Sequence, residues 1–160
     1  MANMIAVVGA SGSGKSTSLR HLDPTETFII NVAGKPLPIR GANRMYTQLT
    51  QDPETKKFSG NMIKSKDVQY IGKILNLINK GMPHIKTVII EDAQYIMSFE
   101  MMERSAEKGY DKFSQIAKNF YDVLQGAMSM RDDLNVCFMT HSENIGTDLN
   151  PNFKMKTLGN

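Results

Sequence analysis

The chain has 160 residues, of which 41% are hydrophobic and 22% are charged, and its formal net charge is +3 at pH 7. This length suits one domain with one hydrophobic core, and the composition excludes wholesale disorder. No apolar stretch approaches the roughly 18 residues that a membrane-spanning helix needs, so we expect no membrane association. The mildly basic charge is compatible with a nucleic-acid partner but does not demand one.

The single cysteine and the N-terminal sequence both bear on where the protein is found. Cys137 lies within the apolar run of residues 136–139, where a buried thiol in a strand is the simplest interpretation, and it has no second cysteine to pair with. The N-terminus carries no basic region followed by a signal-type apolar segment. We therefore expect a cytoplasmic protein.

The first part of the chain predicts two strands and a short helix. Residues 4–8 form a continuous apolar run, which is typical of a parallel strand buried on both faces. Residues 15–22 can form a short helix that ends before Pro24, and residues 27–33 are β-branched and aromatic, which predicts a second strand. Residues 34–60 are irregular and rich in proline and charge, and we expect a long excursion with room for a hairpin.

A helix is predicted next. Ser65 is a candidate N-cap, with Asp67 in the first turn, and Gly81 fits the position just beyond the C-terminus, with Pro83 following it. Between these signals apolar residues recur at helical spacing, namely Val68, Ile71, Leu75 and Ile78.

The second half continues the alternation. Residues 87–90 predict a third strand, residues 93–112 have an uncertain helical start, and residues 113–128 predict a strongly amphipathic helix. Residues 136–140 predict a fourth strand, and residues 142–160 show no clear periodicity. Strands that alternate with helices at this spacing predict an α/β fold with a mainly parallel sheet.

A phosphate-binding motif follows the first strand. Residues 9–16 match G-x-x-x-x-G-K-[ST] in full, between an apolar strand and a helix-compatible stretch, which is the context that a P-loop requires. Glycines let successive N–H groups point at phosphate oxygens, and the following helix adds its positive N-terminal dipole. We expect Lys15 to reach the β- and γ-phosphates, Ser16 to ligate Mg²⁺, and Thr17 to donate its N–H to the α-phosphate. The predicted nucleotide-binding residues are Gly9, Ala10, Ser11, Gly12, Ser13, Gly14, Lys15, Ser16 and Thr17.

Two acids close the third strand at the same edge of the sheet. In the usual plan of such sites, the first acid after the apolar run serves the metal and the second orients the attacking water. This order assigns Glu91 to Mg²⁺ and Asp92 to the water. The reverse assignment stays open because the metal position is normally an aspartate, so Ser16, Glu91 and Asp92 are all candidate metal ligands.

The fourth strand also ends on polar residues. His141 follows Thr140 and is a candidate to contact the γ-phosphate and to respond to its loss, although a histidine at a strand end is more often structural. With Lys15, Glu91 and Asp92 it completes the predicted catalytic group.

Some cations could act on a neighbouring subunit. Lys154 and Lys156 are either ordinary solvated lysines or fingers that stabilise charge on a neighbour's γ-phosphate. Rival candidates for this role are Arg40, Arg44, Arg104 and Arg131.

Two loops follow strand ends on the expected nucleotide side, at residues 93–112 and 142–153. The first mixes cations with aromatic residues, which suits single-stranded nucleic acid because bases stack on aromatic rings while cations follow the phosphates. A solvated helix with a partly buried apolar face explains the same composition. The residues concerned are Tyr95, Phe99, Arg104, Lys108, Tyr110 and Lys112.

With these motifs in this order, the chain resembles the RecA-like ATPases, and more narrowly the small phage-encoded RecA-type proteins implicated in single-strand annealing and recombination. The segments that carry the resemblance are residues 8–16, 31–32, 35–38, 88–92, 138–143 and 154–159. The resemblance implies a P-loop NTPase of RecA-like type, a three-layer sandwich with a mainly parallel central sheet. It also implies ATP and Mg²⁺ as cofactors, ATP hydrolysis, a homo-oligomeric ring or filament, and single-stranded DNA as a partner.

The chain departs from these relatives in two places. They carry further strands after the region that matches residues 154–159, so we expect a single domain over residues 1–160 that lacks those strands. They also carry a catalytic glutamate after the second strand, which this sequence does not show. Two other functions remain open: a small-molecule kinase of the nucleotide type, and a helicase-loader or packaging-type ATPase.

Overall fold

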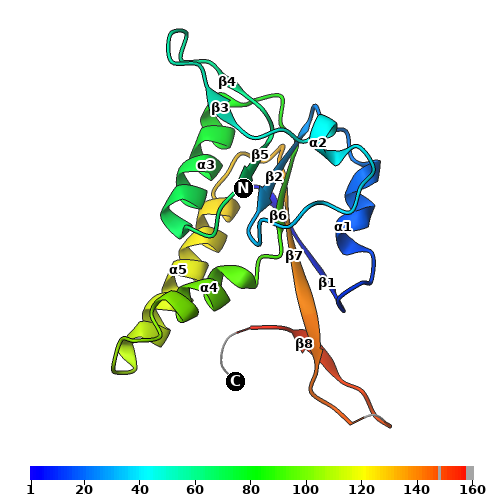
Figure 1. Cartoon of the computed structure of the whole chain (residues 1–160), viewed down its shortest axis with the longest axis vertical. Helices are drawn as coiled ribbons and strands as arrows, with labels where there is room; N and C mark the ends of the chain where they lie inside the picture. Colours follow the sequence, from blue (N-terminus) through cyan, green and yellow to red (C-terminus); the bar gives the residue numbers. More distant parts are fainter. Residues whose placement is uncertain (148, 158–160) are drawn as a thin grey trace.

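The computed structural model of the chain describes residues 1–147 and 149–157. Its centre is a sheet in which five strands run parallel in the order β1-β7-β6-β2-β5, while β8 pairs antiparallel with β7 (Figure 1). The α/β fold with a mainly parallel sheet is therefore confirmed. In this order the strands are Asn3–Gly9 (β1), Asn135–Asn144 (β7), Thr87–Glu91 (β6), Thr27–Asn31 (β2), Met62–Lys64 (β5) and Phe153–Met155 (β8).

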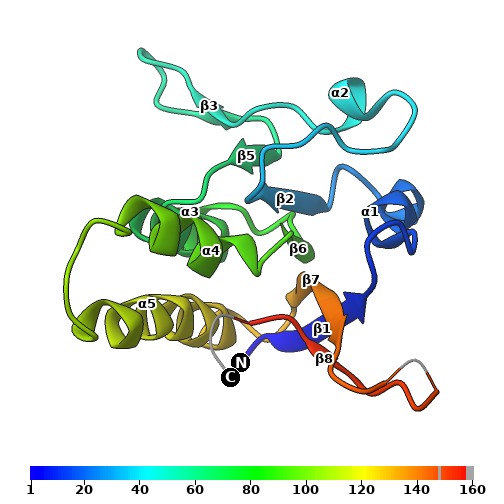
Figure 2. The same cartoon turned by 60° about the horizontal axis from the view of Figure 1, so that its bottom comes forward.

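Helices cover the two faces of the sheet unequally (Figure 2). Three longer helices, α3 (Val68–Gly81), α4 (Tyr95–Glu103) and α5 (Asp111–Met128), lie on one face. On the other face lie the short helices α1 (Lys15–Ser18) and α2 (Ala42–Met45), with a 3-10 turn at Leu19–His21. This arrangement is compatible with a three-layer sandwich.

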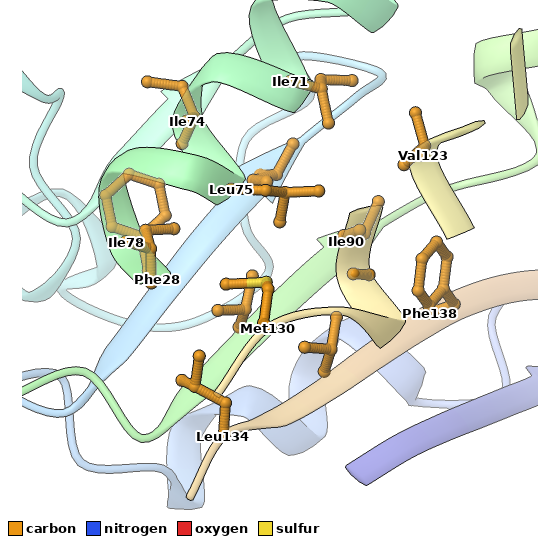
Figure 3. Packing of buried hydrophobic residues seen from close by; sticks show 14 of the residues in the cluster. Phe28, Ile71, Ile74, Leu75, Ile78, Ile90, Val123, Met130, Leu134 and Phe138 are labelled. Carbon is orange, nitrogen blue, oxygen red and sulfur yellow. The ribbon is translucent and has the colours of Figure 1, made fainter. Parts of the chain in front are cut away.

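The larger core lies under the three longer helices. Ile71, Leu75 and Ile78 of α3 are spaced so that they share one side of the helix, and they pack on Phe28 and Ile90 of the sheet (Figure 3). All five are at most 2% exposed. Complete burial of such side chains stabilises the fold by roughly 1.5–3 kcal/mol each relative to exposure.

The smaller core lies under α1 and α2 and uses the alternate residues of the same strands. Ile29, Ile89 and Cys137 lie between the neighbours that face the larger core. They pack with Leu19 and Tyr46, which come from the segments around α1 and α2. Cys137 is a free buried thiol, as the sequence predicts.

The irregular region contains the hairpin that its turn-rich sequence allows, formed by β3 (Thr50–Gln51) and β4 (Phe58–Ser59). It also leads into β5, a strand of the main sheet that the sequence did not predict. β5 has only three residues, too few to show a strand pattern. The turn before it needs glycine, because Gly60 has φ +91° and a Cβ there would lie 2.3 Å from the Gln48 carbonyl oxygen.

Residues 4–8 form a strand, as predicted, but the prediction that this strand is buried on both faces is wrong. β1 is at the edge of the sheet and pairs only with β7 among the described strands. Ile5 and Val8 are consequently 40% and 45% exposed. A continuous apolar run therefore predicts a strand, but it does not predict how many other strands pair with it.

Three predicted boundaries also change. Asp67, not Ser65, is the N-cap of α3: its carboxylate accepts N–H bonds from Gln69 at 2.8 Å and Tyr70 at 3.0 Å. Gly81 is the last helical residue and not the residue beyond the end. β7 continues past His141 to Asn144 because β8, which the sequence did not predict, pairs with that extension.

In the part of the chain that the structure describes, we find no helix with the length and apolar character needed to cross a bilayer.

Candidate functional site

The glycine-rich loop of residues 9–16, which the sequence predicts to be a P-loop, forms a tight turn between β1 and α1. β1 ends at Gly9, and α1 begins at Lys15. Gly12 and Gly14 adopt φ +78° and +89°, a left-handed conformation that side chains disfavour, and Gly14 is the N-cap of α1. The Lys15 ammonium donates to the carbonyl oxygens of Gly9 at 2.7 Å and Ala10 at 2.9 Å. The lysine therefore lies folded over the loop.

The parallel register brings the remaining predicted residues to the same edge. Gly9 lies opposite His141 of β7, and Asn31 of β2 lies opposite Glu91 of β6. Because β7 separates β1 from β6, His141 lies between the P-loop strand and the acidic strand. β2, β6, β7 and the loop that follows β1 therefore contribute polar groups to one edge of the sheet.

Ser16 and Glu91 are in direct contact. The Ser16 hydroxyl donates to Glu91 Oε1 at 2.5 Å, and Glu91 is only 5% exposed. Burial raises the pKa of the Glu91 carboxyl, and the hydrogen bond from Ser16 partly opposes this rise. The pair presents a hydroxyl and a carboxylate oxygen side by side, which is the hard oxygen donor set that Mg²⁺ prefers.

Asp92 has different partners from Glu91, although the two are adjacent. Asp92 adopts φ +59°, which is uncommon for a residue with a side chain, and its side chain is 8% exposed. One carboxylate oxygen, Oδ2, accepts from the Lys35 ammonium at 3.0 Å, and the other, Oδ1, lies 3.1 Å from His141 Nε2. The backbone turn thus directs the two acids to separate positions.

His141 is fixed from several sides. Its backbone N–H donates to the side-chain oxygen of the buried Gln94 at 3.3 Å, and its ring meets Tyr95 edge-on at 6.3 Å between centroids. Together with the contact to Asp92, these interactions hold the imidazole against the acidic strand end. The sequence assigns no role to Gln94, and it indicates Tyr95 only as a candidate contact for single-stranded nucleic acid.

Lys35 and Asn31 are two further site residues to which the sequence alone assigned no role. Asn31 is fully buried at the end of β2, where its amide donates to the Lys35 carbonyl oxygen at 2.7 Å and its Oδ1 accepts from the Gly34 N–H at 2.8 Å. The available signal was a polar residue that ends an otherwise apolar strand, as at Glu91 and His141. Asp92 raises the pKa of the Lys35 ammonium through their hydrogen bond.

One cleft of about 300 Å³ is lined by Lys15, Ser16, Lys35, Glu91, Asp92 and His141. All the predicted catalytic and metal-binding residues line it, as do most of the predicted nucleotide-binding residues. The lining residues are Ser11, Gly12, Ser13, Gly14, Lys15, Ser16, Thr17, Lys35, Pro36, Pro38, Glu91, Asp92 and His141.

The donor set of the cleft fits a metal that is shared with a ligand. Within residues 1–147 and 149–157, no group of three or more His, Cys, Asp or Glu side chains is arranged to hold a metal ion by itself. Mg²⁺ does not require one, since it is usually bound through one or two protein groups, phosphate oxygens and water. Ser16 and Glu91 are placed to provide the protein groups.

The candidate fingers lie elsewhere. Lys154 pairs with Glu143 of β7, and Lys156 lines a separate apolar cavity between β1 and α5. Arg104 is held by Glu100 and Glu107. Arg131 donates to backbone carbonyls near the end of α3, which gives it a structural role within the chain. Leu158 and Gly159, which belong to the segment that resembles RecA-type proteins, lie outside the described residues.

Comparison with models of known protein families finds no match to this chain, and comparison with curated protein sequences also finds none.

Proposed function

We propose that the protein binds ATP with Mg²⁺ in this cleft and hydrolyses it, as a P-loop ATPase of RecA-like type. The observation that carries the proposal is the contact between Ser16 and Glu91, which joins the first turn of the P-loop helix to the acidic strand at 2.5 Å. Two oxygen groups that could bind a metal therefore lie beside the glycine-rich loop, which supports the proposal that the phosphates of a nucleotide bind there.

In this proposal each part of the loop binds a part of the triphosphate. Backbone N–H groups at the start of α1 receive phosphate oxygens, and Lys15 exchanges the Gly9 and Ala10 carbonyls for the β- and γ-phosphates. Mg²⁺ held by Ser16 and Glu91 would neutralise the charge that develops on the phosphate oxygens.

The second acid then acts on the attacking water. Asp92 is buried, and its Oδ1 lies 3.1 Å from His141 Nε2. The neighbouring Glu91 instead accepts a hydrogen bond from Ser16. A carboxylate fixed in this way can accept a hydrogen bond from water and orient it in line with the terminal phosphate. This assigns Glu91 to the metal and Asp92 to the water.

We propose further that the ATPase acts on single-stranded DNA, in the manner of phage recombination or annealing proteins, and assembles as a homo-oligomer. Supporting observations lie around the start of α5, where Tyr110 is 87% and Phe113 45% exposed, and Lys112 lies 5.5 Å from the Phe113 ring centroid. Exposed aromatic rings beside cations suit bases and phosphates of a single strand.

The kinase alternative has less support in the cleft. Nucleotide kinases of this kind normally bring arginines over the phosphates, whereas the described residues that line the cleft include Lys15 and Lys35 but no arginine. Arg40 and Arg44 flank the start of α2 and are not among the lining residues.

The test is phosphate release from Mg·ATP by the wild type and by Lys15→Ala, each with and without single-stranded DNA. The proposal predicts release by the wild type, stimulation by DNA, and loss of both in the variant while the fold is retained. Lys57→Ala, on the exposed β3–β4 hairpin, is the matched control and should behave as the wild type. Full release by purified Lys15→Ala would contradict the mechanism. Release without any response to DNA would contradict only the DNA part.

A further inference from the structure

The cleft contains a second lysine that reaches it from a different part of the chain. Lys35 follows β2, whereas Lys15 belongs to the P-loop, and both line the cleft together with Asp92. The Lys35 side chain is 58% exposed, while the Asp92 side chain that it pairs with is 8% exposed. The lysine therefore has room to change its position, and the aspartate does not.

The backbone of Lys35 is fixed even though its side chain is exposed. The buried Asn31 amide binds the Lys35 carbonyl oxygen and the Gly34 N–H, with both distances below 3 Å. Gly34 has φ +68°, which lets the chain turn there without strain. Any movement of the ammonium therefore takes place through the rotamers of the side chain, which have low barriers and are rapid.

Asp92 would keep a partner if Lys35 left it. Its Oδ1 lies 3.1 Å from His141 Nε2, so the buried carboxylate would retain one hydrogen-bonded neighbour. Complete removal of partners from a buried charge is costly, and this second contact reduces that cost. The ammonium also lies 4.7 Å from the ring centroid of Tyr95, the first residue of α4.

A terminal phosphate is a stronger competitor for Lys35 than the carboxylate. It offers three acceptor oxygens and more negative charge, whereas Oδ2 of Asp92 offers a single contact. A diphosphate lacks this terminal group, and therefore competes less at the position beyond the β-phosphate.

We propose that Lys35 is a positioning residue that senses the terminal phosphate: its ammonium leaves Asp92 for that phosphate, and Oδ2 of Asp92 becomes free to hold the attacking water. The inference rests on the proposed function. It adds that recognition of the triphosphate by Lys35 frees the Asp92 carboxylate from the Lys35 ammonium. With a diphosphate bound, Lys35 stays on Asp92 and the acid remains blocked.

The test compares two affinities in each protein: that for Mg·ADP and that for the magnesium complex of a non-hydrolysable ATP analogue, adenylyl imidodiphosphate. Lys35→Met keeps the length and apolar stem of the side chain but removes the charge. The proposal predicts that this variant loses about tenfold in affinity for the triphosphate analogue, the size of one charge-assisted hydrogen bond, and changes less than twofold for ADP.

Two controls separate sensing from a structural effect. Lys35→Arg keeps a cation and should restore most of the preference for the triphosphate. Lys57→Met removes an exposed lysine on the hairpin and should leave both affinities unchanged. In the wild-type protein, the side-chain NMR signal of Lys35 should shift with the triphosphate analogue more than with ADP, a measurement that does not depend on the stability of any variant.

The outcomes distinguish this inference from the proposed function. If the wild type binds both nucleotides but Lys35→Met leaves their affinity ratio unchanged, or lowers both affinities equally, the sensing role is overturned and the nucleotide site stands. If the wild type binds neither nucleotide, the proposed function fails and the role of Lys35 fails with it.

Discussion

The two faces of the sheet differ in what they contribute. The face under α3, α4 and α5 carries the larger hydrophobic core, whereas the face under α1 and α2 carries a small one, made of Leu19, Ile29, Tyr46, Ile89, Cys137 and Met139. Side chains alternate along a strand, and Asn31, Glu91 and His141 have the same parity as Ile29, Ile89 and Met139. We call the face under α3, α4 and α5, with its larger core, the thicker face, and the face under α1 and α2 the thinner face. The candidate site therefore lies at the strand ends on the thinner face, while the thicker face supplies most of the buried apolar surface.

The largest expected effect separates the two faces by stability. Phe28→Ala removes a fully buried ring from the thicker face and should lower the free energy of unfolding by about 3–5 kcal/mol. Leu19→Ala, on the thinner face just after α1, should cost about 2–3 kcal/mol and also weaken nucleotide binding, because Leu19 anchors the helix that follows the P-loop. Denaturant unfolding and nucleotide titration of both variants measure the difference. Equal effects of the two changes on binding would contradict the division between the faces.

The next effect concerns the site alone. Asp92→Asn keeps the shape of the side chain but removes the charge that its proposed water-orienting role requires. If the proposal holds, the variant should hydrolyse ATP about 100-fold more slowly, with little loss of ATP binding. Steady-state phosphate release and equilibrium binding provide the two measurements. Equal losses in binding and hydrolysis would instead place Asp92 among the nucleotide-binding groups.

The buried acid gives a pH dependence with a definite sign. Burial raises the pKa of Glu91 in the folded state, so the folded protein binds its proton more tightly than the unfolded chain does. This residue therefore lowers stability as the pH rises from the ordinary carboxylate pKa through the raised one. Glu91→Gln should remove that loss, and should be more stable than the wild type at pH 7, with the difference vanishing in acid. The test is the free energy of unfolding of both proteins, measured as a function of pH. The expected sign would be contradicted if the stability of Glu91→Gln relative to the wild type fell between acid pH and pH 7.

The smallest effect tests a boundary on the thicker face. Asp67→Ala removes the N-cap of α3 and should cost about 1 kcal/mol, whereas Ser65→Ala should cost less because Ser65 bonds only the Asp67 N–H. Thermal or denaturant unfolding of the two variants decides the assignment. A larger cost for Ser65→Ala would restore the cap that the sequence pattern favoured.

The sequence predicted the parts of the fold that depend on local patterns. The P-loop follows from its glycines and lysine, and β2, β6 and β7 follow from apolar runs, so the sequence alone is enough to place Glu91 and His141 at one edge of the sheet. The position of β1 at the edge could not be predicted, because the number of neighbours of a strand is set by tertiary pairing. β5 and β8 have three residues each and offer no periodicity to detect.

The missed site residues have a common physical reason. Lys35 reaches Asp92 across 57 positions of sequence, and only the parallel pairing of β2 with β6 brings them together. The left-handed conformation of Asp92, which turns it away from Glu91, is also invisible in the residue types. Chemistry at the ends of individual strands can be predicted, whereas pairing between strand ends requires the sheet order.

The most direct test of the proposed nucleotide site is the binding of ATP to the wild type and to Ser16→Ala, with Mg²⁺ and with the metal chelated. The account predicts saturable binding to the wild type that strengthens when Mg²⁺ is present, and a large loss of this metal-dependent part in Ser16→Ala, whose missing hydroxyl contacts Glu91 in the wild type. Absence of binding to the wild type, or an equal metal dependence in both proteins, would contradict the claim that Ser16 and Glu91 hold Mg²⁺ and a triphosphate in this cleft.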